Sequence, residues 1–415
     1  MLSRAAPRTA WWVALAALLL IVLETGLRLG ANSPDTRFTL PQYSLGYFWD
    51  TPLGWTGVID GVPVNKDAVQ FHSLAGFLHG LAVPVPPQDN VYVRFAGYSL
   101  LGSALAPLIG SYASFVVINI LFWLAGALAT YVLAIRKTGS IQTGVLAALL
   151  VCTAPFFEGL AGQPLPYVAS YALFALGLLL FDQVRLFEKD ASLRTAALAG
   201  LAGGTALLFY DLYMLPAFVV VYGVLRRTPL RTLALALVLM AVLRVVWSGY
   251  WQLMQLPSYS HNETHPIEAL QAWLDTARVG SGPRVILGYA ALAAHGLLNI
   301  GAVFLFWPLV AAAWELWQRR RMAEVTWFVA VAIAGFGPAL FMLSTWPHLP
   351  RWYAYGFPAV YILAAAAVSR LGWGLGIALI VLPSVLIANL DVLGITQPME
   401  LLLFQPERWS YLWSP

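Results

Sequence analysis

Carboxylates outside the apolar runs are the first side chains of this sequence that could do chemistry. Asp50, Asp60 and Asp67 lie in one polar segment near the N-terminus, and Asp211 stands between two apolar runs further along. A carboxylate at the rim of a membrane can act as a general base or as a ligand of a divalent metal ion. Each of these residues can instead be solvated in a loop, and Asp67 opens a predicted helix, where Asp is a favoured N-cap.

Arginine and aromatic residues beside the apolar runs could hold an anionic or sugar-like ligand. Arg351 lies where an apolar run near the C-terminus begins. A guanidinium can hold a phosphate through two parallel hydrogen bonds, although an arginine beside an aromatic belt can also snorkel to the membrane surface. Arg244 stands inside an apolar run, where a charge is costly, so it faces a polar cavity or lies near enough to one end to snorkel. Trp49 could stack on a sugar ring or rest on lipid headgroups.

No metal centre and no soluble cofactor motif is predicted. The spacing of the histidines matches no metal-binding motif, and the single cysteine, Cys152, allows neither an internal disulfide nor a cysteine metal cluster. The sequence contains no P-loop, G-x-S-x-G, H-E-x-x-H or Rossmann fingerprint in a soluble context. Soluble nucleotide chemistry is therefore not indicated, and a divalent metal held by carboxylates stays an open alternative.

The composition is that of a membrane protein. Of the 415 residues, 60% are hydrophobic and only 10% are charged, and the mean hydropathy is +0.74. A soluble domain carries roughly 25% charged residues. The 17 Trp and 18 Tyr residues suit the aromatic belts at a membrane surface. The net charge of +4 comes from scattered basic residues, so no nucleic-acid partner is expected. We therefore predict an all-α, polytopic membrane protein with the lipid bilayer as its surroundings.

The apolar runs predict about eleven transmembrane helices, since each span needs about 20 residues. They lie near residues 11–30, 112–135, 141–157, 165–184, 195–211, 213–226, 231–254, 297–318, 324–344, 353–369 and 373–392. The first run follows Arg4 and Arg8 but precedes no convincing cleavage site, so we interpret it as a transmembrane helix and not as a signal peptide.

Basic residues orient these predicted helices. With the N-terminus in the cytoplasm, every short inward loop carries Lys or Arg, as the positive-inside rule expects. The basic residues on that side are Arg4, Arg8, Arg136, Lys137, Arg185, Lys189, Arg194, Arg226, Arg227, Arg231, Arg319, Arg320, Arg321 and Arg370. We expect one transmembrane domain, residues 1–415, in a prokaryotic plasma membrane. Its two long loops, 31–111 and 255–296, are then extracytoplasmic.

The first long loop is expected to contain two helices that lie on the membrane surface. Residues 95–109 could be taken for a span, but a crossing there would invert the charge pattern of everything that follows. Residues 67–81 have apolar side chains at helical spacing, and three prolines follow. Residues 46–64 are rich in Gly, Pro and aromatics and are predicted to be irregular.

Three segments in chain order resemble motifs of the GT-C superfamily, the membrane glycosyltransferases that use polyprenyl-phosphate sugars, and in particular its ArnT/PMT-like group. The helix that begins at Asp67 is similar to the family's first loop helix, which carries an aspartate, an aromatic residue, an alanine and a glycine. The segment from Arg94 to Gly110 resembles the Arg-Pro-Pro helix that follows it, and the segment from Arg351 to Pro358 resembles a late Arg-Tyr element.

The resemblance implies an inverting glycosyltransferase of GT-C architecture that uses a polyprenyl-phosphate-linked sugar at the outer face of the membrane. Asp67 would take the proton of the acceptor hydroxyl, with Asp60 and Asp50 as alternatives, and Arg351 would stabilise the phosphate that departs. The residues expected to bind substrate are Arg351, Arg94, Asp211, Tyr98, Trp49 and Tyr353. The family's Arg-Pro-Pro is Arg94-Phe95-Ala96 here, which leaves the metal requirement and the donor open.

Two other classes of function compete with this interpretation. A transporter or flippase would also have many spans, but transporters often contain internal repeats and polar residues at the bilayer midplane. The sequence shows no repeat, and most of its polar residues fall outside the predicted spans. A catalytically silent membrane scaffold is the third possibility. An enzyme predicts an outward cavity that both Asp67 and Arg351 face, beneath helices 67–81 and 95–109.

Overall fold

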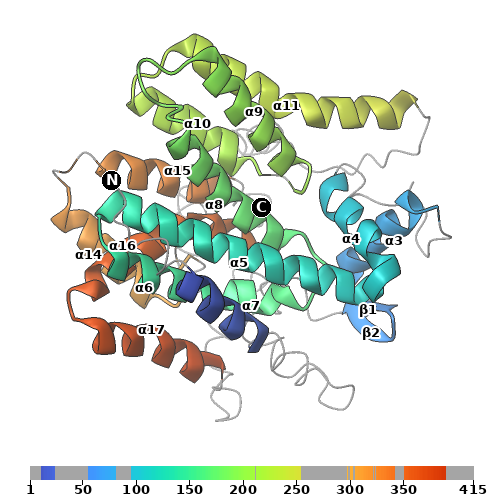
Figure 1. Cartoon of the computed structure of the whole chain (residues 1–415), viewed down its shortest axis with the longest axis horizontal. Coiled ribbons are helices and arrows are strands. Elements are labelled where there is room, and N and C mark those ends of the chain that lie inside the picture. Colours follow the sequence, from blue (N-terminus) through green and yellow to red (C-terminus); the bar gives the residue numbers. More distant parts are fainter. Residues whose placement is uncertain are drawn as a thin grey trace, which may run out of the picture.

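Apolar sequence forms helix throughout most of the described chain. The computed structural model describes residues 11–23, 55–80, 95–210, 212–253, 297, 300–301, 304–320, 322, 324–341 and 350–388. The side chains of some residues in these ranges, including Asp67, Glu158 and Arg351, are outside this description. The helices pack as one bundle, and a short hairpin with two helices lies at one end of it (Figure 1).

The bundle is assembled from helices of very different length. It begins with the N-terminal helix Trp11–Leu23. The elements that follow the hairpin and its two helices are α5 (Ser111–Thr138), α6 (Ile141–Cys152), α7 (Pro155–Ala161), α8 (Tyr167–Gln183), α9 (Leu193–Leu207), α10 (Met214–Leu225), α11 (Leu230–Leu253), α14 (Trp307–Gln318), α15 (Val325–Phe341), the 3-10 segment η5 (Pro350–Gly356), α16 (Phe357–Ser369) and α17 (Trp373–Ala388).

Fewer of these helices reach spanning length than the sequence predicts. Within the described residues, α5 and α11 are long and apolar enough to cross a membrane, and eight further apolar helices have 10–17 residues. Prolines account for part of the difference. The predicted span 141–157 stops at Cys152 and restarts as α7 at Pro155, because proline has no N–H to continue a helix but suits the first helical turn. Within the predicted span 297–318, the structure describes the helix Trp307–Gln318 and separate helical residues at 297 and 300–301.

A two-stranded antiparallel hairpin replaces the irregular structure that we expected before Val64. β1 (Trp55–Ile59) pairs with β2 (Val62–Asn65), and Ile59 stands opposite Val62. Both residues of the turn have positive φ, 51° at Asp60 and 83° at Gly61. Asp-Gly is a preferred pair for such a turn because its backbone twist matches that of the strands. The dipeptide was therefore the signal for a hairpin, and the prediction of an irregular segment was wrong there.

The two helices predicted for the first loop are both present. α3 (Lys66–Leu78) and α4 (Ala96–Ile109) pack against each other beside the hairpin, at one end of α5 (Figure 1). A single residue, Gly110, separates α4 from α5, and its φ of 88° favours glycine. The chain reverses sharply there, so α4 folds back onto α5 instead of continuing it.

Glycines bring α9 and α11 into close contact. A Cβ atom on Gly200 would lie 2.7 Å from the carbonyl oxygen of Ala236, and one on Gly204 would lie 2.9 Å from that of Met240. Small residues allow this approach of two backbones, which is a common way for helices to associate in membranes.

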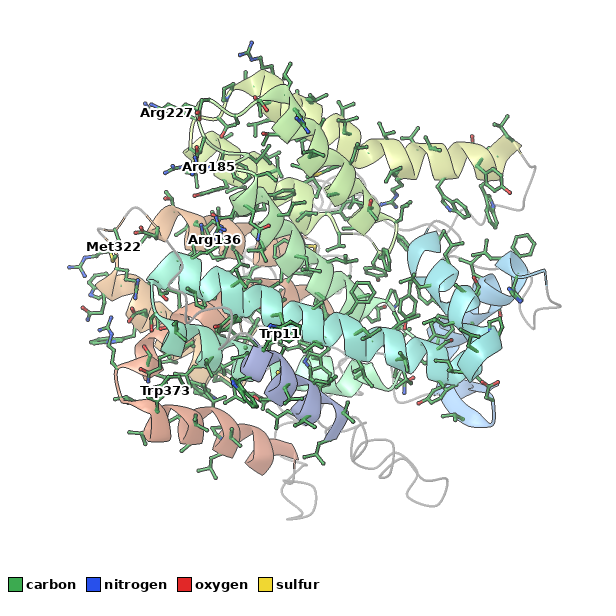
Figure 2. All side chains as sticks on the ribbon, viewed as in Figure 1. Trp11, Arg136, Arg185, Arg227, Met322 and Trp373 are labelled. Carbon is green, nitrogen blue, oxygen red and sulfur yellow. The ribbon has the colours of Figure 1, made fainter. Side chains whose placement is uncertain are left out.

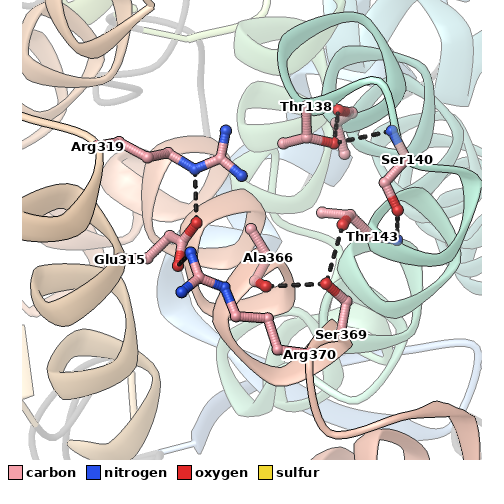
Figure 3. A network of polar contacts seen from close by, with 9 residues as sticks. Thr138, Ser140, Thr143, Glu315, Arg319, Ala366, Ser369 and Arg370 are labelled. Atoms are coloured by element: carbon pink, nitrogen blue, oxygen red, sulfur yellow. Dashed lines mark hydrogen bonds and ion pairs between the residues drawn. The ribbon is translucent and has the colours of Figure 1, made fainter. Parts of the chain in front are cut away.

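Charged residues gather at the end of the bundle opposite the hairpin. Arg136, Arg185 and Arg227 all lie there (Figure 2). A second charged cluster joins α14 to α16, where the fully buried carboxylate of Glu315 contacts Arg319 at 2.5 Å and Arg370 at 2.6 Å (Figure 3). The Arg370 contact is one of charge, since Oε2 of Glu315 accepts no aligned hydrogen bond. Beside it, Thr143 donates to Ser369 at 3.3 Å and so links α6 to the same helix end.

Candidate functional site

The helix that carries Asp67 is held by α4. Asp67 lies in the first turn of α3. One turn further along, the carbonyl oxygen of Phe71 accepts a hydrogen bond of 3.0 Å from the hydroxyl of Ser99. The rings of Phe71 and Tyr98 meet edge to face at 5.8 Å between centroids. α4 thus fixes α3 through one polar and one aromatic contact, four residues beyond the predicted base.

Tyr98 connects α4 to the interior of the bundle. Its side chain is fully buried, and its hydroxyl donates to Oδ1 of Asn119 in α5 at 3.1 Å. Its ring also packs on Phe115, with 5.1 Å between centroids. The sequence resemblance predicted substrate binding for Tyr98. That role stays a prediction. In this structure the Tyr98 side chain is fully buried and contacts Phe71, Phe115 and Asn119.

The turn between α7 and α8 is held by side chains of α5. Nδ2 of Asn119 donates to the carbonyl oxygen of Gln163 at 2.7 Å, with longer approaches of 3.2 Å to Ala161 and 3.4 Å to Leu160. The hydroxyl of Tyr112 donates to the remaining carbonyl, that of Gly162, at 2.7 Å. The last carbonyls of a helix have no partner within the helix. Here α5 supplies partners for the end of α7.

The start of α4 reaches a second aromatic cluster. The N–H of Gly97 donates to the carbonyl oxygen of Leu208 at 2.9 Å. The buried ring of Phe95 lies 5.0 Å from that of Tyr210, whose ring lies 5.0 Å from Tyr167 at the beginning of α8. The guanidinium of Arg244, in α11, lies 5.5 Å from the ring centroid of Phe95. An aromatic face attracts a cation, so the ring of Phe95 gives this charge inside an apolar run a favourable neighbour.

The segment that carries Arg351 packs on the same helix, α8. In η5, Tyr353 is buried, and the hydroxyl of Tyr355 lies 2.7 Å from that of Ser170. The ring of Tyr355 also packs on Tyr171, with 4.9 Å between centroids. The first turns of α8 therefore contact both the aromatic cluster beside α4 and the segment around Arg351.

Asp60 stabilises the beginning of α5 from the hairpin turn. Its Oδ2 accepts a hydrogen bond of 2.9 Å from the backbone N–H of Tyr112, in the first turn of α5. A carboxylate there complements the positive end of the helix dipole. The same charge acts on His72 in α3. Burial lowers the pKa of His72 below its usual value, and the charge of Asp60 raises it in part.

Several predicted site residues lie outside the described part of the chain. Asp50, Trp49, Arg94 and Asp211 are among them, as are the side chains of Asp67 and Arg351. The predicted outward cavity is therefore not tested. The backbones that flank these residues do converge, since Phe95 follows Arg94, Tyr210 precedes Asp211, and their two rings are in contact.

In the part of the chain that the structure describes, a metal-binding cluster is absent and an apolar cavity lies away from this end of the molecule. Within the described residues, no three His, Cys, Asp or Glu side chains are grouped so that they could hold a metal ion. An apolar cavity of about 280 Å³ lies elsewhere, between the N-terminal helix and α6, and Trp12, Leu20, Val145 and Cys152 are among its lining residues. None of the predicted site residues lines it.

The sequence reasoning missed Asn119 as a residue of this region. It is fully buried and binds both Tyr98 and the α7–α8 turn. Its signal was available, because a lone amide inside an otherwise apolar helix must find polar partners. Its partners lie 21 positions away at Tyr98 and 44 positions away at Gln163, which no local pattern reveals.

The fold is shared with known membrane proteins, although the sequence alone matches none. No protein-family model and no curated protein matches the sequence. The structure is similar to that of ArnT from Cupriavidus metallidurans, solved with bound undecaprenyl phosphate, with a TM-score of 0.56 and 21% identity over 74% of this chain. It also matches the archaeal oligosaccharyltransferase AglB from Archaeoglobus fulgidus, solved with an inhibitory peptide and a dolichol-phosphate, with a TM-score of 0.47 and 13% identity over 94% of this chain.

The chain spans 56% of the length of each of these two proteins. The chain is therefore structurally similar to the GT-C membrane glycosyltransferases over most of its length, as its sequence motifs predicted.

Proposed function

We propose that this protein is a membrane glycosyltransferase that moves a sugar from a polyprenyl-phosphate donor to an acceptor hydroxyl at the outer face of the membrane. The observation that carries the proposal is the similarity of its fold to ArnT, a protein solved with a polyprenyl phosphate bound. The placement of α3 and α4 supports it, because both helices predicted to surround the site pack at one end of the bundle.

The charge distribution supports an outward-facing site. Arg136, Arg185 and Arg227 gather at the end of the bundle opposite α3 and α4 (Figure 2). Basic residues are enriched on the cytoplasmic side of membrane proteins. That end is then cytoplasmic, and the hairpin with α3 and α4 faces the periplasm or the cell exterior.

The proposed reaction is a single displacement at the anomeric carbon. The carboxylate of Asp67 takes the proton of the acceptor hydroxyl as its oxygen forms a bond to that carbon. The bond between the carbon and the phosphate oxygen breaks on the opposite face, so the configuration inverts and the electron pair leaves with the polyprenyl phosphate. Arg351 stabilises the charge that develops on this phosphate. Arg94, Asp211, Trp49 and Tyr353 bind the remainder of the substrates in this proposal.

The test compares lipids and glycans from a deletion strain with those from strains that carry the wild-type or a variant protein. We expect the deletion to accumulate a polyprenyl-phosphate sugar and to lose one glycan modification. Asp67→Asn should fail to restore the modification although the protein inserts normally. Asp190→Asn is the matched control, since this exposed aspartate lies in the turn between α8 and α9. An unchanged lipid and glycan profile in the deletion strain would overturn the proposed function, whereas full activity of Asp67→Asn would transfer the role of base to Asp60 or Asp50.

A further inference from the structure

We propose that Tyr98 and Asn119 are positioning residues, which set the orientation of the Asp67 helix from the α7–α8 turn. The proposal rests on the proposed function in its last step only, where Asp67 acts as a base. Its earlier steps concern the coupling of three segments and can be measured without any activity. No local feature of the sequence assigns such a role to either residue.

The first step is the anchoring of Asn119. Its amide nitrogen donates to the carbonyl oxygen of Gln163 at 2.7 Å, which leaves its oxygen pointing toward α4 as an acceptor. The side chain is fully buried, so water cannot replace either partner. The amide can adopt only one orientation, because exchanging its oxygen and nitrogen would place an acceptor against the carbonyl oxygens of the α7–α8 turn and break those hydrogen bonds.

The second step transfers this fixed position to α4. The hydroxyl of Tyr98 donates to Oδ1 of Asn119 at 3.1 Å, and its ring is held between Phe115 and Phe71. A buried donor left without its acceptor is costly, so the tyrosine follows the amide. The rotation of α4 about its own axis is therefore set from inside the bundle.

The third step reaches α3. Ser99, the next residue of α4, donates to the carbonyl oxygen of Phe71 at 3.0 Å. That carbonyl belongs to the residue one helical turn beyond Asp67, and in a regular α-helix the N–H of that residue bonds to the carbonyl oxygen of Asp67. A shift of α4 consequently moves the backbone that carries the predicted base. Misplacement of a catalytic group by about 1 Å can reduce a rate roughly 100-fold.

The test uses Tyr98→Phe, which removes only the hydroxyl that bonds to Asn119. Its matched control is Tyr112→Phe, which removes one tyrosine hydroxyl bonded to the same turn but without contact to α4 through that bond. Hydrogen exchange of the peptide amides is followed by mass spectrometry in nanodiscs. We expect exchange within α3, residues 66–78, to become about five-fold faster in Tyr98→Phe, as for the loss of one buried hydrogen bond, and to stay unchanged in Tyr112→Phe.

Asn119→Leu and the double variant complete the cycle. If the two residues act as one unit, the double variant should show no faster exchange in α3 than Asn119→Leu alone. The single variant Tyr98→Phe keeps the test decisive even where Asn119→Leu fails to insert. Unchanged exchange of α3 in Tyr98→Phe, or an equal increase in Tyr112→Phe, would overturn the coupling.

The kinetic arm separates positioning from simple loss of structure. Transfer of radiolabelled sugar from the polyprenyl-phosphate lipids of the host is measured in membrane vesicles. Tyr98→Phe should lower kcat roughly 10- to 100-fold with KM within about two-fold, since binding groups elsewhere are intact. A rise in KM at unchanged kcat would show that Tyr98 binds substrate instead. Absence of transfer by the wild-type protein would refute the proposed function, while the exchange result for α3 would still stand or fall by itself.

Discussion

Replacement of Glu315 by Gln tests whether the charged cluster at the basic end of the bundle stabilises the fold. Gln preserves the volume and one acceptor oxygen but removes the charge that faces Arg319 and Arg370. The carboxylate is fully buried, whereas the two arginine side chains differ in exposure, 17% for Arg319 and 54% for Arg370. The three residues therefore provide their own internal comparison.

The expected magnitudes follow from burial. Removal of one partner from a buried ion pair costs about 3–5 kcal/mol, because the other charge is left without compensation. Because Arg370 can turn toward solvent when the carboxylate is neutralised, we expect Glu315→Gln to lower the free energy of unfolding by about 2–4 kcal/mol, which is shifted below the usual range for a buried pair. Arg319→Gln should cost a similar amount, since that arginine is mostly buried. Arg370→Gln should cost about 0–1 kcal/mol, the usual value for an exposed pair.

The assay is a set of denaturant titrations in one detergent, from which the free energies of unfolding of the variants are compared. A double-mutant cycle between Glu315 and Arg319 should give a coupling energy of about 1–3 kcal/mol, and the cycle with Arg370 a smaller one. The reasoning is refuted if Arg370→Gln destabilises the protein as much as Arg319→Gln, or if Glu315→Gln has the stability of the wild type.

Three further predictions concern other parts of the fold. Gly200→Val should sharply reduce the amount of folded protein, because a Cβ there would meet the carbonyl oxygen of Ala236 at 2.7 Å. Gly249→Ala in α11 should be neutral, because a Cβ there would have nothing within 4 Å. The amount of folded protein is compared by size-exclusion chromatography of the two variants. Asp60→Ala should cost about 0.5–2 kcal/mol through loss of the hydrogen bond to the N–H of Tyr112, while Asp60→Asn, which keeps an acceptor, should cost less in the same titrations. Because the pKa of His72 is lowered in the folded protein, the unfolded chain takes up a proton first as the pH falls, and the free energy of unfolding should decline below about pH 6.5. His72→Gln should flatten this decline when thermal unfolding is measured between about pH 5 and 8. An unaltered slope in that variant would show that other groups cause the decline.

Local sequence patterns predicted the helices of this fold better than the turns and helix breaks that connect them. α5, α11, α3 and α4 follow from apolar periodicity, since each has a long run or a regular face. The hairpin turn at Asp60 had a recognisable signature, but its short strands are embedded in a segment rich in Gly and Pro. The helix break before Pro155 also has a sequence signal, the proline itself, but the apolar residues on both sides resemble one continuous span.

The candidate site was predictable only as a region. The motif resemblance predicts a site around Asp67, Arg94 and Arg351, which stays a prediction, and the fold brings the neighbours of Arg94 and Asp211 together. The groups that hold these segments could not be found in this way. Asn119 and Gln163 are 44 positions apart, and the ring contact between Phe95 and Tyr210 joins residues that are 115 positions apart in sequence. Such pairs depend on tertiary packing, which a single sequence leaves undetermined.

The contacts of α4 impose an order on the biogenesis of this protein. The hairpin and α3 are translated first, but Asp60 finds its partner only 52 residues later, and the carbonyl of Leu208 that binds Gly97 follows about 110 residues after that glycine. At roughly 5–20 residues per second, α4 therefore waits about 5–20 s for its last anchor. During this interval α4 can already pack on α3 and α5, but the first turn of α4 lacks its contacts with Leu208 and Tyr210. The end of the molecule that carries the proposed chemistry is thus completed late, after α9 has been inserted.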